Sequence, residues 1–209
     1  MNVRITKEQK IKIGEPDDVY KIMQQILLRE NKIRRNQEHF WIVGLNNAHK
    51  ILFIELLCLG ASNRVNIDPP DVFRMAIYKL ASKAILVHNH PSGEVVPSEA
   101  DKGFTDHMLK AGKFLRIEVL DHLIITDHTY ASMGELGIME ELRNNGNYEM
   151  IKGEKDELME FKLRIEGERG AKEKAIAIAK NSLKEKMDVK LIAKITGLTV
   201  KQVERLKGK

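Results

Sequence analysis

An apolar run at residues 84–87 leads without a break into a loop and then into a helix signal. The run reads AILV and is followed by HNHPSGEVVPSEAD at residues 88–101. A short apolar run is typical of a buried strand, while Pro and Gly indicate a loop after it. Ser98 with an acid three residues later is typical of a helix N-cap. The sequence therefore predicts a strand–loop–helix unit whose loop begins at His88 and whose helix begins at Ser98.

Two imidazoles and one carboxylate of this unit can converge on a single cation. His88 and His90 are two residues apart in extended chain, so their side chains lie on the same side. Asp101 falls in the first turn of the predicted helix, where the helix dipole favours a carboxylate. Three protein ligands and one open position are typical of a catalytic zinc site. We predict that these three residues bind Zn²⁺, although a purely structural role for the histidine pair stays open.

Hydrolysis at such a site also needs a carboxylate that takes a proton from water and returns it to the leaving group. Glu38 stands at the start of a predicted strand at residues 38–45, which we expect beside the strand at 84–87. The residues alone do not separate this role from that of a surface acid at a strand edge. Asp121 and His122 are also adjacent in a predicted strand, where they either have a structural role or support the metal ligands.

The remaining segments alternate between helical and extended patterns, which is typical of an α/β fold. Gly112 is expected to end the helix that begins at Ser98. The predicted helices are at residues 17–29, 68–80 and 98–111, and the predicted strands are at 38–45, 50–59, 84–87 and 117–126.

Residues 151–209 form a basic tail with 16 Lys/Arg and 10 Asp/Glu. Their pattern predicts one long helix at 151–187, followed by two short helices separated by Gly197. Thr199 and Gln202 form a capping-box signature at the start of the last helix. Two interpretations of the charge stay open, a solvated helix surface and contact with nucleic acid. The long helix is also a candidate for self-association.

The spacing of the site residues resembles a known motif. His88-x-His90, seven residues, Ser98, two residues and Asp101 resemble the JAMM motif. The strings HNHPSGEVVPSEAD and AGKFLRIEVLDHLII resemble the bacterial RadC family over residues 15–137. The resemblance implies a cytidine-deaminase-like α/β fold of the JAB/MPN type, with a mixed sheet flanked by helices. It also implies a zinc metalloprotease or isopeptidase that acts on a peptide or protein substrate.

Two site roles follow from that resemblance. It implies that Glu38 is the general acid/base and that Ser98 is a catalytic residue supporting the oxyanion or the attacking water. The alternative for Ser98, a helix N-cap only, stays open. The end of the tail is similar to the C-terminal segment of Rpn-like transposase/nuclease proteins and has a helix-turn-helix-like pattern.

These observations give a domain organisation and a set of alternatives. We expect an N-terminal segment at 1–14, a RadC-like JAB/MPN+ domain at 15–137, a linker at 138–150 and a helical tail at 151–209. The principal predicted function is that of a zinc-dependent metallohydrolase. The alternatives are a DNA-associated protein of repair or mobile-element biology and a non-catalytic interaction module.

The sequence lacks the motifs of several other classes of protein and of metal site, which excludes them. The zincin string H-E-x-x-H does not occur, and the single cysteine, Cys58, cannot supply the ligands of a nucleobase deaminase, a four-Cys zinc site or an internal disulfide. The first residues are charged and lack the apolar stretch of a signal peptide. We therefore expect a cytoplasmic protein without membrane contact.

Overall fold

The computed structural model describes residue 3, residue 6, and residues 11–60 and 67–207. Parts of the predicted N-terminal segment, namely residues 1–2, 4–5 and 7–10, lie outside this set. The chain divides into two compact units, Met1–Lys162 and Leu163–Lys209. Each unit is described by itself below.

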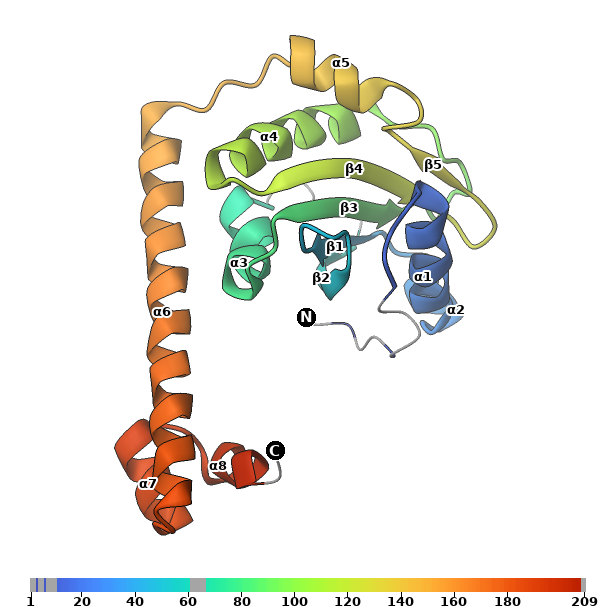
Figure 1. Ribbon diagram of the computed structural model, residues 1–209. Helices are drawn as coiled ribbons and strands as arrows, with labels where there is room; N and C mark the ends of the chain where they lie inside the picture. Colours follow the sequence, from blue (N-terminus) through green and yellow to red (C-terminus); the bar gives the residue numbers. More distant parts are fainter. Residues whose placement is uncertain (1–2, 4–5, 7–10, 61–66, 208–209) are drawn as a thin grey trace. The chain divides into compact units, whose positions relative to one another are not determined.

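The first unit is built on a mixed five-stranded sheet, which confirms the predicted α/β class (Figure 1). The strand order is β2-β1-β3-β4-β5, and only β3 and β4 are parallel neighbours. The strands are β1 (His39–Leu45), β2 (Ile51–Leu59), β3 (Lys83–Asn89), β4 (Glu118–Ile125) and β5 (Tyr130–Ser132). The helix between β3 and β4 makes the crossover that a parallel pair requires.

Helices cover the sheet because its central strands are buried on both faces. Odd-numbered residues of β1, β3 and β4, such as Val43 and Val87, form one core cluster with α1. Even-numbered residues face α3 and α4, as shown by the edge-to-face contact of Phe40 with Phe104 of α4. The helices of this unit are α1 (Pro16–Leu28), α2 (Lys32–Arg35), α3 (Pro69–Lys79), α4 (Glu99–Leu115) and α5 (Ile138–Asn145).

The end of α4 differs from the prediction. The helix continues through Gly112 to Leu115, and Arg116 ends it in the left-handed conformation with φ 61°. A Cβ atom at Gly112 would lie 2.6 Å from the carbonyl oxygen of Ile117. The glycine is therefore a site of close approach between the helix and the following chain, which sequence pattern cannot distinguish from a helix stop.

Three short elements were not predicted, and one of them lies where a linker was expected. The α2 helix is a single turn, and β5 has three residues that pair with the end of β4. The α5 helix falls within residues 138–150. The single turn of α2 and the three residues of β5 are too short to show a periodic pattern, so tertiary contacts decide them.

The second unit is the C-terminal part of the long helix α6 (Lys152–Lys184) together with α7 (Val189–Thr196) and α8 (Val200–Lys207). Its small core contains Ala179, Ile192, Leu198 and Val203. Gly197 ends α7 with φ 72°, and Thr199 and Gln202 form the predicted capping box. In the described part of the chain, no helix is both long and apolar enough to cross a membrane.

Candidate metal centre

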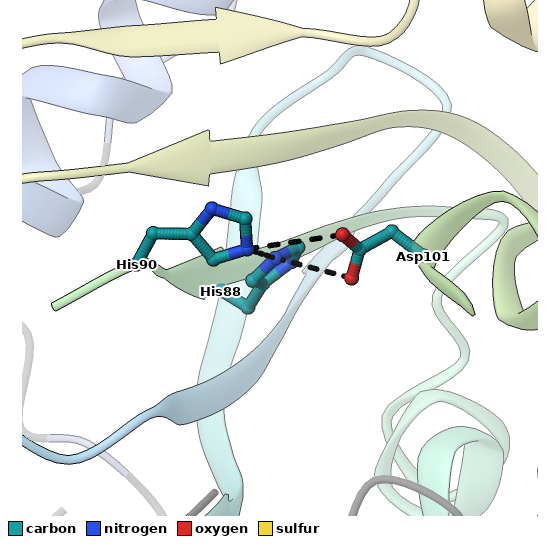
Figure 2. A group of neighbouring side chains, drawn as sticks. All are labelled: His88, His90 and Asp101. Carbon is teal, nitrogen blue, oxygen red and sulfur yellow. Dashed lines mark hydrogen bonds and ion pairs between the residues drawn. The ribbon is translucent and has the colours of Figure 1, made fainter. Parts of the chain in front are cut away.

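The side chains of His88, His90 and Asp101 point toward one another at the end of β3 and the start of α4 (Figure 2). One ligand atom from each residue can be chosen so that all three lie within 4.8 Å of one another. The Nε2 atoms of the two histidines are 2.9 Å apart. Asp101 Oδ1 lies 3.3 Å from His88 Nε2, and Asp101 Oδ2 lies 3.7 Å from His90 Nε2. The structure thus brings the three predicted ligands together.

The strand periodicity explains why His88 faces α4. Ala84, Leu86 and His88 alternate with residues that pack against α1, so they face α4 on the other side of the sheet. Both His88 and Asp101 are buried, and His90 is half-buried where the strand gives way to the loop. Of the three side chains, His90 is therefore the one most accessible to solvent.

Asp101 is fixed by the N-terminal capping box of α4. The Ser98 hydroxyl donates to Asp101 Oδ2 over 2.6 Å, and the Ser98 amide donates to the same oxygen over 2.9 Å. In return, the Asp101 amide donates to Ser98 Oγ over 3.1 Å. Ser98 is thus an N-cap that also orients the carboxylate toward the histidines.

A chain of buried hydrogen bonds fixes the tautomer of His88. Thr105 Oγ1 lies 2.6 Å from the Asp101 carbonyl oxygen and 2.6 Å from His122 Nδ1. A carbonyl oxygen can only accept, so the Thr105 hydroxyl donates to it and His122 Nδ1–H must donate to Thr105. Neutral His122 then has a free lone pair on Nε2, which accepts from His88 Nδ1–H over 2.8 Å. The lone pair of His88 Nε2 is consequently directed into the site.

His90 is oriented in the same sense by a backbone contact. Its Nδ1–H donates to the carbonyl oxygen of Glu94 over 2.8 Å, which leaves the Nε2 lone pair of His90 free. Two imidazole lone pairs that face each other at short range beside a carboxylate repel one another unless a proton or a cation lies between them. The donor set therefore fits a divalent metal, and its two-imidazole, one-carboxylate composition suits zinc.

Asp121 and His122 have different roles although they are adjacent. The Asp121 carboxylate accepts from the Ser132 hydroxyl at 2.5 Å, from the Gly134 amide at 2.8 Å and from the His122 amide at 2.7 Å. Asp121 therefore has a structural role in the turn that follows β5. His122 contacts His88 directly and is the residue that supports a ligand.

Glu38 lies directly before β1, close to the metal-bearing end of β3. Phe40 of β1 is the pairing partner of His88, and the amide of His39 donates to the side chain of Asn89 over 2.7 Å. The carbonyl oxygen of Glu38 accepts from the amide of Gly60, and the residue is half-buried. The backbone thus places Glu38 at the predicted end of the sheet.

Two cavities flank the ligand set. One, of about 270 Å³, is lined by Phe40, Phe104 and Tyr148 and reaches Asp101 and His122. The other, of about 290 Å³, is more polar and reaches His90; its lining includes Lys32, Arg35, Asn36 and Asp127. The ligand set thus borders an aromatic cavity through Asp101 and a more polar cavity through His90.

A titratable cluster lies at the edge of the aromatic cavity. His107 stacks on Tyr148 with ring centroids 4.0 Å apart, and burial lowers the pKa of His107 although Glu154 opposes this. Burial and a hydrogen bond to Glu154 raise the pKa of Tyr148 to about 12. The same hydrogen bond lowers the pKa of Glu154. His107 is therefore held as a neutral imidazole next to an ionised carboxylate.

Sequence reasoning missed Thr105 and left the role of His122 open. Thr105 lies one helical turn after Asp101, so its hydroxyl reaches the carbonyl of a metal ligand. That spacing is a usable signal, but the contact with His122 depends on how α4 packs on β4.

Comparison with known proteins agrees with this geometry. The family model described as the RadC-like JAB domain matches residues 13–138. The chain belongs to the RadC-like JAB domain family. JAB domains of this kind are related to the JAMM metallohydrolases, and the predicted resemblance of residues 15–137 to the RadC family is confirmed.

Several curated relatives are named UPF0758 protein. The chain is 42% identical over 128 residues to that of Alkaliphilus metalliredigens, which covers 61% of this chain and 53% of the relative. It is 40% identical over 132 residues to that of Caldanaerobacter subterraneus, with 63% and 54% covered. The protein of Methanosarcina mazei is 37% identical over 133 residues, with 64% and 56% covered. The chain thus spans a little over half the length of the relatives that it matches.

Proposed function

We propose that this RadC-like JAB chain is a zinc-dependent hydrolase of peptide or isopeptide-like bonds. The observation that carries the proposal is the convergence of two imidazole lone pairs and a capped carboxylate on one point. The hydrogen bonds of these side chains orient the Nε2 lone pairs of both histidines and the Asp101 carboxylate toward that point. Such preorganisation is typical of a functional metal site.

The roles of the residues follow from their positions. His88, His90 and Asp101 would hold the zinc, which supplies Lewis-acid chemistry and lowers the pKa of water when bound. Glu38 takes the proton from the attacking water and delivers it to the leaving nitrogen. The Ser98 hydroxyl, which donates to Asp101 Oδ2 in the structure, turns from that oxygen to donate to the oxygen on which negative charge develops. The two flanking cavities bind the chain on either side of the cleaved bond.

The substitution Glu38→Gln tests the proposed base. We expect zinc content near one ion per chain to be retained and hydrolysis of a peptide and isopeptide library to fall by at least about 100-fold. Glu99→Gln is the matched control, because Glu99 is an exposed acid two residues from Asp101 that pairs with Lys102. Hydrolysis that survives in Glu38→Gln removes the assignment of this base, and a wild-type chain that binds no zinc removes the function.

The C-terminal unit supports a second candidate function, contact with nucleic acid. Its last two helices surround a shared core with α6, and residues 189–207 contain five Lys/Arg and one acid. Lys201 and Arg205 of α8 are both exposed and four residues apart on one helix face. A basic helix after a tight turn is a common arrangement for binding a phosphate backbone.

A salt titration of duplex DNA binding tests this candidate. We expect the affinity to fall as salt rises, and the double variant Lys201→Glu/Arg205→Glu to reduce the slope by about 2. The control Lys152→Glu/Lys155→Glu changes the same charge at the other end of α6. Binding that does not depend on salt, or that changes equally in both variants, rejects the candidate.

A further inference from the structure

A further cavity lies at the end of the parallel β3–β4 pair that is opposite the candidate metal centre. This cavity of about 460 Å³ is lined by Ser82, which precedes β3, and by residues 116–119 at the start of β4. The candidate ligands His88 and His90 lie at the opposite end of β3, toward which both strands run in Figure 1. The cavity is therefore separate from the metal centre and from the two cavities beside it.

The floor of the cavity is apolar and rigid. Leu109, Ile117 and Val119 are buried side chains that line it. Gly112 also lines it, and its missing Cβ lets the backbone of α4 approach Ile117 closely. A floor built from a helix and a strand that pack this tightly keeps its shape when a ligand enters.

The rim of the cavity carries four cations and one acid. The cations are Lys110, Lys113, Arg116 and Arg143, and the acid is Glu118. Lys113 and Arg116 make no ion pair with the part of the chain that the structure describes. Lys110 and Lys113 are three residues apart near the end of α4, and Arg116 follows as its C-cap.

Arg143 of α5 lies at this rim and has hydrogen-bond donors that its backbone contacts do not use. Its Nη2 donates to the carbonyl oxygens of Val119 and Leu120 over 3.0 and 3.1 Å. A guanidinium has five N–H donors, so the hydrogens on Nη1 and Nε remain for another acceptor. The backbone contacts fix the side chain, which lowers the entropy that binding an anion would cost.

The dipole of α4 explains only part of this arrangement. Cations near a helix C-terminus are stabilising, which accounts for Lys113 and Arg116. It does not account for Arg143, which comes from another helix. It also leaves unexplained the Ser82 hydroxyl, which is buried at the cavity and has no hydrogen-bond partner among the described residues.

We propose that this cavity binds a small anion with an apolar body, such as an aromatic phosphate, sulfonate or carboxylate. The apolar body lies on the floor, where its burial is favourable. The anionic group meets the rim cations, and the Ser82 hydroxyl donates to the ligand. The volume is within the range of ordinary small-molecule sites.

Fluorescence titration of the full chain with 1-anilinonaphthalene-8-sulfonate tests the proposal. This probe has both an aromatic body and a sulfonate. We expect saturable binding to the wild type and about tenfold weaker binding to Lys113→Glu/Arg116→Glu. The control Lys180→Glu/Lys184→Glu changes the same net charge at exposed positions of α6, so its affinity should equal that of the wild type.

A neutral probe and a melting curve complete the test. N-phenyl-1-naphthylamine has the same aromatic rings without the sulfonate, and we expect its affinity to be low and equal in all three proteins. Equal sulfonate affinity in the rim variant and the control overturns the proposal, as does equal affinity of the wild type for both probes. If the rim variant melts below the wild type, the milder Arg116→Gln is measured, and an unchanged affinity there also overturns it.

Discussion

The two ends of α4 carry opposite charge arrangements. At its N-terminus Asp101 meets two neutral imidazoles, and the side chains are short, largely buried and hydrogen-bonded. At its C-terminus Lys113, Arg116 and Arg143 line one cavity, and the side chains are long and exposed over an apolar floor. Both ends follow the helix dipole, which favours anions at the first turn and cations at the last.

The difference concerns how each end is organised for its ligand. The metal end is fixed by side-chain hydrogen bonds, so its geometry is set before an ion binds. At the cavity end the floor and Arg143 are fixed, whereas Lys113 and Arg116 are exposed and can adjust to anions of different shape. One helix thus joins a site suited to one kind of ion with a site suited to a class of molecules.

The largest expected effect comes from Asp101→Asn. Loss of the anionic member of the three proposed ligands should weaken zinc binding by at least about 100-fold, as measured by competition with a chelating dye. Binding of the naphthalene sulfonate probe at the other end should stay unchanged. The control Asp71→Asn removes an exposed acid from the first turn of α3 and should alter neither measurement. A loss of probe binding in Asp101→Asn would show that the two ends are coupled.

An intermediate effect is expected from Thr105→Val. The substitution keeps the shape of the side chain but removes the acceptor for His122, so His88 is no longer held in one tautomer. Zinc affinity should fall by about 10- to 100-fold. Thr105→Ser keeps the hydroxyl and should restore the affinity, whereas a general packing defect would not be restored in this way. Equal zinc affinity in Thr105→Val and the wild type contradicts the hydrogen-bond chain.

The smallest effect concerns His107, midway along α4. Burial lowers the pKa of this histidine below its ordinary value of 6.5, so the unfolded chain takes up a proton before the folded chain does. The free energy of unfolding should therefore fall as the pH is lowered through 6.5. His107→Gln removes this titration, and denaturant unfolding at pH 7.5 and 5.5 should show a smaller decrease in the variant. A larger decrease in the variant contradicts the assigned direction.

The sequence predicted the elements that have a periodic pattern. The four longer strands and α1, α3, α4, α7 and α8 are close to their predicted ranges, because alternation and helical spacing are local properties. The predicted end of α4 was wrong because Gly112 allows the helix to pack closely against Ile117 and does not terminate it. The three residues of β5 could not be predicted, since their pairing with β4 is a long-range contact.

By itself, the sequence determined the family of this chain and the identity of its three candidate ligands, because both depend on residue types at fixed spacing. Only the tertiary structure decided which residues support those ligands and where the cationic cavity lies. His122 reaches His88 from a neighbouring strand, and Arg143 reaches the cavity from a separate helix. Contacts between segments far apart in the chain depend on packing, which no local spacing encodes.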